Sequence, residues 1–285
     1  MKNYVYLFVF LLITACTSVK NDPNKEDWIQ LFNGKDLTGW DIKIAGSALN
    51  ENFNNTFRVK DGVLTASYDQ YQKFNGEYGH IFYKDKFSYY KIRVQYRFVG
   101  QQTPGGAGWA FRNSGIMLHG QSAASMTKDQ SFPTSIEFQL LGGSGEGERP
   151  TGNLCTPGTN VVMKDSLFTP HCINSSSKTF NGDQWVEAEA VVLGDSAITH
   201  LINGDTVLSY TKPQLDEREA TYPEMFTHFG SKMLKEGSIS LQGESHPVEF
   251  RKVELLNLKG CMDKKAVNYK SYFVESDNSQ CKYSK

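Results

Sequence analysis

Alternation of apolar and polar residues is the feature that most constrains how this chain can fold. In the run at 91–98 every even-numbered residue is apolar and every odd-numbered residue is polar, and the run at 136–140 repeats this pattern. A period of two is that of a β-strand with one buried face. No helical run of comparable length stands out between residues 28 and 258, so the pattern predicts an all-β chain.

Turn signals between the alternating runs indicate antiparallel pairing. Asp-Gly at 61–62 and Asn-Gly at 203–204 each separate two short apolar runs, as the central residues of tight β-hairpins do. The run at 248–256 changes phase near Lys252, which predicts a β-bulge. Many such strands predict two antiparallel sheets packed as a β-sandwich or jelly roll, with a site in its concave cleft. The best helix candidate is a short turn at 216–219.

The amino terminus resembles a bacterial lipoprotein signal. A basic residue precedes an apolar run at 5–13, which is shorter than the roughly 20 residues of a membrane-spanning helix. The run leads into Leu-Ile-Thr-Ala-Cys, which resembles a lipobox whose cysteine is lipidated. We expect a signal peptide at 1–15, a lipid on Cys16 and a tether at 16–27, with an ordinary cleaved signal as the alternative. The chain would then be an exported lipoprotein on the inner or outer membrane of a Gram-negative bacterium, in the periplasm or on the cell surface.

Four cysteines lie beyond the lipobox. An even number in an exported chain predicts disulfides, and the sequence allows three pairings. We favour Cys155–Cys172 and Cys261–Cys281, because each pair lies within its own segment. A zinc site is the weaker alternative, because the chain has no Cys-x-x-Cys pair.

Charge and composition bound the partners and the domains. The 30 basic and 31 acidic side chains give a formal net charge of −1, whereas a nucleic-acid binder normally has a basic surplus. We therefore expect no nucleic-acid partner. The composition becomes polar after residue 258, which predicts a main domain at 28–258 and a small disulfide-closed segment at 259–285.

The segment WIQLFNGKDLTGW at 28–40 resembles the opening of the 3-keto-disaccharide hydrolase family. Further matches are NSGI at 113–116, EFQ at 137–139, the hairpin at 203–204, GSISLQ at 237–242 and PVEFRKV at 247–253. The resemblance covers about residues 28–258. It implies a concanavalin A-like jelly roll in exported bacterial proteins that cleave glycosides whose sugar carries a ketone at carbon 3.

The segment 260–283 resembles short disulfide-closed modules that are appended to surface proteins of Gram-negative bacteria. Asp263, Asn268 and Asp277 offer oxygen atoms of the kind that calcium binds. A disulfide-stapled tail without structural calcium is the simpler interpretation, and we prefer it.

The available residues suit proton abstraction better than conventional glycoside hydrolysis. A conventional glycosidase needs two carboxylates, and the strand from Glu137 lacks the second and third acids that concanavalin-like retaining enzymes usually carry there. In a 3-keto sugar the ketone acidifies the proton on carbon 2, so one base can remove it and expel the substituent on carbon 1. A proton donor and hydrogen-bond donors for the enolate assist, and water can add afterwards.

Glu137 is the expected base, or the residue that fixes the base, and it shares a strand face with Gln139. We expect His119, on the polar face with Met117, and His80 to act as acid or enolate partners, with a structural role as the alternative for each. The expected substrate-binding residues are Gln139, Arg112, Glu148, Lys232, Gln242 and His246. No cofactor is expected, although a divalent metal bound by distant strands of the cleft stays open.

Two functions from different classes compete. The first is an exported enzyme that cleaves 3-keto-glycosides by elimination, with or without hydration. The second is a non-catalytic surface lipoprotein that binds glycans, and the missing second carboxylate favours it. Both predict a carbohydrate partner and a membrane anchor.

Overall fold

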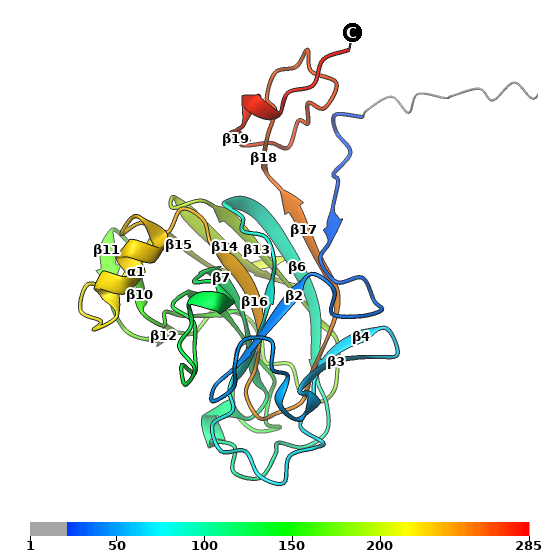
Figure 1. Ribbon diagram of the computed structural model, residues 1–285, viewed down its shortest axis with the longest axis vertical. Helices are drawn as coiled ribbons and strands as arrows, with labels where there is room; N and C mark the ends of the chain where they lie inside the picture. The colour runs from blue at the N-terminus through cyan, green and yellow to red at the C-terminus, as the bar shows by residue number, and fades with distance from the viewer. Residues whose placement is uncertain (1–21, 285) are drawn as a thin grey trace, which may run out of the picture.

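Two antiparallel sheets pack face to face in the computed structural model, which describes residues 22–284 (Figure 1). The predicted signal peptide and Cys16 lie outside the described residues. The larger sheet has the order β11-β10-β15-β14-β13-β6-β17-β4-β3, with β1 beside β17. Its strands are β1 (Ile29–Gln30), β3 (Phe57–Lys60), β4 (Val63–Ala66), β6 (Tyr89–Phe98), β10 (Thr159–Met163), β11 (Ser166–Phe168), β13 (Val186–Leu193), β14 (Ala197–Ile202), β15 (Asp205–Leu215) and β17 (Val248–Asn257).

The smaller sheet has seven strands in the order β12-β9-β8-β7-β16-β5-β2. They are β2 (Trp40–Ile44), β5 (Gly79–Tyr83), β7 (Asn113–Gly120), β8 (Ile136–Leu141), β9 (Asn153–Cys155), β12 (Cys172–Ile173) and β16 (Ser238–Gly243). Strand β16 lies between β7 and β5, both of which are more than 100 residues away in the sequence, and such long crossovers are typical of a jelly roll. The predicted all-β sandwich of two antiparallel sheets is therefore confirmed.

The core lies between the sheets and follows from the alternation. Along β6 the even-numbered side chains are buried and the odd-numbered ones are partly exposed. Ile136, Phe138 and Leu140 of β8 are all 0% exposed, and they pack into the same core cluster. Each large apolar side chain buried in this way contributes about 1.5–3 kcal/mol to stability.

The predicted turns are present. Positive φ angles at Asn203 (52°) and Gly204 (89°) join β14 to β15, and the Asp-Gly pair at 61–62 joins β3 to β4 in the same way. A register shift between Arg251 and Glu254 marks the bulge near Lys252, whose φ is 54°.

The short turn that was the best helix candidate at 216–219 is present, but the regular helix begins after it. Asp216 accepts a hydrogen bond from the backbone N–H of Arg218, which holds a turn there. The α-helix α1 is Tyr222–Phe229, with a proline in its first turn and Gly230 in the left-handed conformation at its end. Four 3-10 turns complete the helical structure of the described residues: η1 (Phe53–Asn55), η2 (Gly108–Ala110), η3 (Ala123–Ser125) and η4 (Asn278–Gln280).

Both favoured disulfides are present, Cys155–Cys172 and Cys261–Cys281. The second closes the small C-terminal segment, where β18 (Lys259–Gly260) pairs in parallel with β19 (Glu275–Ser276). This segment lies beyond one end of the sandwich, next to the first described residues (Figure 1). Lys270 forms an ion pair with Asp27, so the last residues of the predicted tether are held against the C-terminal segment.

Candidate functional site

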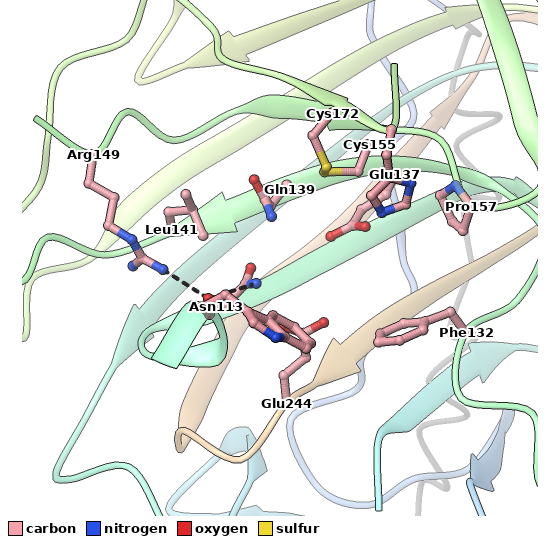
Figure 2. Close-up of a pocket in the computed structure, with 12 residues that line it drawn as sticks. Asn113, Phe132, Glu137, Gln139, Leu141, Arg149, Cys155, Pro157, Cys172 and Glu244 are labelled. Carbon is pink, nitrogen blue, oxygen red and sulfur yellow. Dashed lines mark hydrogen bonds between the residues drawn. A yellow bond between two sulfur atoms is a disulfide. The ribbon is translucent and has the colours of Figure 1, made fainter. Parts of the chain in front are cut away.

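A cavity of about 390 Å³ opens on the face of the smaller sheet that is turned away from the core (Figure 2). Strands β7 and β8 provide its floor, and the loop between β8 and β9 provides one wall. We call it the acid–base cavity. Its lining residues are Trp109, Asn113, Phe132, Glu137, Gln139, Leu141, Arg149, Cys155, Pro157, His171, Cys172 and Glu244.

The floor is open because a glycine lies at its centre. Gly115 of β7 pairs with Gln139 of β8, and a Cβ at this position would lie 2.8 Å from Oε1 of Glu137. The side chains of Glu137 and Gln139 therefore reach into space that a larger residue would fill. Gln139 Oε1 accepts a hydrogen bond from Asn153, which orients the amide.

Two carboxyl groups meet in this cavity. Glu137 is 6% exposed and Glu244, which directly follows β16, is 2% exposed. Burial raises the pKa of Glu137 to about 8. Burial, and then the charge of Glu137, raise the pKa of Glu244 well above its ordinary value, and the charge of Arg149 opposes this with a smaller effect. Because two like charges in one apolar site disfavour each other, the two groups titrate as a pair, and burial keeps both of them mainly protonated at neutral pH.

Arg149 anchors the wall opposite the carboxyl pair. Its guanidinium donates hydrogen bonds to the backbone carbonyls of Arg112, Gly142 and Trp109. The amide of Asn113 donates to the same Trp109 carbonyl, and Figure 2 shows both interactions. Arg149 therefore links the β8–β9 loop to the turn that carries Trp109.

The Cys155–Cys172 disulfide forms part of the cavity lining, and Cys155 is paired with Glu137 in the sheet. This cross-link fixes β12 to β9 beside the first carboxyl group. The disulfide therefore shapes the cavity as well as stabilising the fold.

Aromatic rings form the other side of the cavity. Trp109 is 55% exposed and stacks on Tyr78, with ring centroids 5.7 Å apart. Phe132 packs against the same Tyr78 at 4.9 Å. Sugar rings stack on exposed aromatic rings of this kind. Trp109 therefore lies at the cavity and not in the core, where tryptophan is more often found.

The predicted orientation of His119 is wrong. His119 is 0% exposed, its Nε2 lies 3.1 Å from the carbonyl oxygen of Gly194, and its ring packs edge-on against Tyr90 in the core. The cause is a register shift between β16 and β7, accompanied by a φ of 49° at His119. The extra residue reverses the alternation, so Met117 keeps the predicted face and His119 does not line the cavity.

Three predicted binding residues do not line the cavity. Arg112 forms an ion pair with Asp183 outside the cavity. Lys232 pairs with Glu217 near α1. The third, Glu148, is exposed on the β8–β9 loop, whereas the next residue of that loop reaches the cavity.

His246 also lies away from the cavity, packed edge-on against Phe98 and Phe111. His80 and Gln242 are paired on neighbouring strands and are 0% exposed, on the same sheet face as the cavity but outside its lining. Of the predicted residues, Glu137 and Gln139 are therefore the two that the structure brings together in the cavity.

No group of three or more His, Cys, Asp or Glu side chains gathers as a metal site within residues 22–284. The three residues considered for calcium each hydrogen-bond to neighbours: Asp263 to Tyr283, Asn268 to the backbone of Lys282, and Asp277 to Ser279. No helix in the described part of the chain is long and apolar enough to cross a membrane.

Sequence reasoning did not identify Glu244 as the second carboxyl group of the site, and it missed Arg149. Glu244 continues the polar phase of Ser240 and Gln242, which was the available signal, but it lies on a different strand from Glu137. The expectation that a second carboxylate is missing was based on the strand of Glu137 alone. In the folded chain the second carboxylate, Glu244, comes from the end of β16.

These features define a class of protein, a jelly-roll β-sandwich with a carboxyl pair in a cavity on one sheet face. The chain belongs to the family of 3-keto-alpha-glucoside-1,2-lyase-like domains, whose model matches residues 27–256. The family predicted from the sequence motifs is confirmed.

Similar solved structures share low sequence identity with the chain. A putative glycosyl hydrolase from Parabacteroides distasonis is 18% identical, with a TM-score of 0.46 over 81% of this chain and 93% of that one. A carbohydrate binding module from Bacillus subtilis is 9% identical, with a TM-score of 0.43 over 77% and 96%. LamA from Z. galactanivorans, crystallised with laminaritriose and laminaritetraose, is 10% identical, with a TM-score of 0.46 over 81% and 98%. No curated protein matches the sequence.

Proposed function

We propose that the protein is a carbohydrate-active enzyme that cleaves 3-keto-glycosides by elimination, with the Glu137–Glu244 pair as base and acid. Family membership supports the substrate class. The observation that carries the mechanism is the pair itself, two buried carboxyl groups in one cavity with raised pKa values. Elimination needs one ionised and one protonated group at the same time, and the pair reaches this state when Glu137 loses its proton while Glu244 keeps its own.

The steps follow from this arrangement. Ionised Glu137 removes the proton from carbon 2, and the electron pair forms an enolate with the ketone at carbon 3. The enolate collapses, the bond between carbon 1 and the leaving oxygen breaks, and protonated Glu244 gives its proton to that oxygen. The products are an unsaturated keto sugar and a free alcohol, and later addition of water at carbon 1 gives net hydrolysis.

The surroundings suit a sugar with a leaving group. Gln139 lines the cavity and accepts a hydrogen bond at its Oε1 from Asn153, so its Nε2 is the end of the amide that can donate to a substrate oxygen. Trp109 offers an exposed ring for stacking. A second cavity of about 410 Å³ shares Phe132 and Pro157 with the acid–base cavity, which gives room for a second ring.

The paired carboxyl groups also favour a second candidate, a conventional glycosidase that acts on unoxidised sugars. This chemistry uses one carboxylic acid and one carboxylate on opposite sides of the glycosidic bond. A glycan-binding protein without turnover is the third candidate. Two questions separate the three candidates: whether the protein cleaves a sugar at all, and whether cleavage requires the ketone.

The test mixes the purified protein with a 3-keto-disaccharide and, separately, with its unoxidised parent, and follows both by NMR. Loss of the keto sugar alone, with an enone-type intermediate or exchange of the carbon 2 proton, is the expected result. Cleavage of both sugars would establish the conventional glycosidase, and binding without change to either sugar would establish the binding protein.

Matched variants assign the residues. We expect Glu137→Gln and Glu244→Gln to reduce turnover about 100-fold or more, since each removes one proton-transfer group. Glu148→Gln is the control, because Glu148 lies on the cavity loop but is exposed to solvent. Turnover that survives in Glu137→Gln would remove this residue from the mechanism.

We further propose that the protein is exported and anchored to a membrane through a lipid on Cys16. The lipobox-like residues before Cys16 and the two disulfides support this proposal, because disulfides persist in oxidising compartments. Cys16→Ala should move the protein from the membrane fraction to the soluble fraction of fractionated cells. An unchanged distribution would contradict the lipid anchor.

A further inference from the structure

Unpaired polar atoms gather on the smaller sheet beside the acid–base cavity. Both ring nitrogens of His80 and both polar atoms of the Gln242 amide have no hydrogen-bond partner within residues 22–284, and both side chains are 0% exposed. The hydroxyl of Ser240 is equally buried and unpaired. Buried polar groups are rarely left unpaired. Folding removes their hydrogen bonds to water, and an unpaired group gains no hydrogen bond in return. A set of such neighbours on one sheet face offers donors and acceptors that the polar groups of a ligand can pair with.

These side chains continue the floor of the cavity. His80 pairs with Gln242, and the pairing of Leu241 with Ile116 places Gln242 opposite Gly115. Gly115 in turn pairs with Gln139, which lines the cavity. A single row across the sheet therefore leads from Gln139 through the open position at Gly115 to His80.

Phe132 lies between the cavity and the His80 end of this row. Its ring lines the cavity and lies edge-on to the His80 ring, with centroids 6.1 Å apart. Figure 2 shows the ring at the margin of the cavity, on the opposite side from Arg149. Phe132 is partly exposed and belongs to a connection between β7 and β8 in which the regular structure is η3. Rotation of this one side chain would join the row to the cavity.

The chemistry of the row suits an uncharged, hydroxyl-rich ligand. Burial, and then the charge of Lys43, lower the pKa of His80 to about 3, so its ring is neutral and offers one donor and one acceptor. Gln242 offers donors and an acceptor. Ser240 lies two residues before Gln242 on β16, on the same face beside the row, and offers a hydroxyl. Vicinal sugar hydroxyls both donate and accept, and they match this set without bringing a charge into it.

We propose that His80, Gln242 and Ser240 form an inner subsite that hydrogen-bonds the hydroxyl groups of an uncharged sugar ring once the Phe132 ring turns aside. The inference rests on the proposed function for the sugar's identity, because the ring in this subsite belongs to the substrate whose bond faces Glu137 and Glu244. His80 is here a binding residue and transfers no proton.

The first test reads the subsite and the reaction separately in one sample. Long-range ¹H–¹⁵N NMR spectra report the ring nitrogens of each histidine, and His80 is assigned with His80→Gln. Addition of the 3-keto-disaccharide or its parent should shift both His80 nitrogens and leave His119 and His200, which are buried in the core with hydrogen-bond partners, unchanged.

The outcomes distinguish the two proposals. Cleavage of the keto sugar without any shift at His80 would overturn the inner subsite and leave the proposed function standing. A shift at His80 with neither sugar cleaved would support the subsite and contradict the enzyme. No shift and no cleavage would overturn both, and buried water would then be the partner of these atoms.

The second test uses Gln242→Leu, which replaces the unpaired amide by an apolar group of similar size. We expect the dissociation constant of the sugar to rise tenfold or more and the melting temperature to stay equal or increase. Thr65→Val is the matched control, because Thr65 carries a buried unpaired hydroxyl on the larger sheet, away from the cavity. Affinity within twofold of the unmodified protein in Gln242→Leu would overturn the inner subsite.

Discussion

Replacing Glu137 by glutamine should make the protein more stable at neutral pH, and the gain should disappear in acid. Burial raises the pKa of Glu137 from 4.5 to about 8 in the folded state. A carboxyl group whose pKa is raised by folding favours the folded state below its unfolded pKa, and this contribution is lost as the pH rises towards the folded pKa. The stability of the unmodified protein should therefore decrease between pH 4.5 and pH 8.

The size of the effect follows from the same two pKa values. At pH 7 the unfolded carboxyl is almost fully ionised, whereas the folded one still holds most of its proton. Linkage then gives a loss of about 3 kcal/mol relative to pH 4, as an upper limit. Glutamine has nearly the shape of the protonated acid and cannot ionise, so Glu137→Gln avoids this loss.

Urea denaturation followed by tryptophan fluorescence at pH 4, 6, 7 and 8, with the disulfides intact, measures the difference. The free energies of unfolding of the two proteins should agree at pH 4 and diverge by up to about 3 kcal/mol at pH 7. Exposed Glu148→Gln is the control and should show no pH-dependent difference. A constant offset at every pH, or a less stable Glu137→Gln at pH 7, would refute the claim that Glu137 is buried with a raised pKa.

Three further predictions concern the same cavity. Because Glu137 must be ionised to act as base, kcat/KM for the keto sugar should increase about tenfold per pH unit below 8 and level off above it; a flat profile from pH 5 to 8 would contradict this role. Gly115→Ala should destabilise the protein by about 1–3 kcal/mol in thermal unfolding and block sugar binding, since the new methyl would lie 2.8 Å from a Glu137 oxygen; unchanged affinity would count against the cavity. Replacing Cys155 and Cys172 together by alanine should cost about 3 kcal/mol and weaken sugar binding, because these residues also line the cavity; lost stability with unchanged binding would show that the disulfide does not shape the site.

The sequence predicts most of the fold because the relevant signals are local. Alternation within β6 and β8, the Asn-Gly turn at 203–204 and the bulge at Lys252 each depend on a few consecutive residues. The same period placed Glu137 and Gln139 on the face that carries the cavity.

His119 shows where a local signal is insufficient. The residue with the positive φ in this bulge is His119 itself, at 49°, and not a glycine. The space for the bulge comes from the facing chain, because a Cβ on Gly237 would lie 2.4 Å from the backbone carbonyl carbon of His119. The bulge thus depends on Gly237 as well as on His119, and these residues are far apart in the sequence. The alternation of β7 alone therefore predicts the wrong face for His119.

The pairing of Glu244 with Glu137 was missed for a related reason. A carboxyl pair can be assembled from two strands that are neighbours of a third, and the sequence does not give the strand order. Here β7 lies between β8, which carries Glu137, and β16, which Glu244 directly follows. The pairing of the two carboxyl groups depends on the order of the strands in the sheet, and the residue pattern of a single strand does not predict that order.

The outward polar residues of the larger sheet form ion pairs, whereas several of those on the smaller sheet have no partner among the described residues. This contrast supports the location of the site on the smaller sheet. On the larger sheet Arg93 lies 2.7 Å from Glu189 and 3.1 Å from Glu254, and Arg97 lies 2.6 Å from Glu249, so charges on neighbouring strands neutralise each other. On the smaller sheet two carboxyl groups share a cavity, and buried His80 and Gln242 have no partner among the described residues. Each unpaired buried group costs about 1–3 kcal/mol, which a fold optimised for stability alone would avoid. The smaller sheet therefore carries a destabilising arrangement that a bound sugar can compensate.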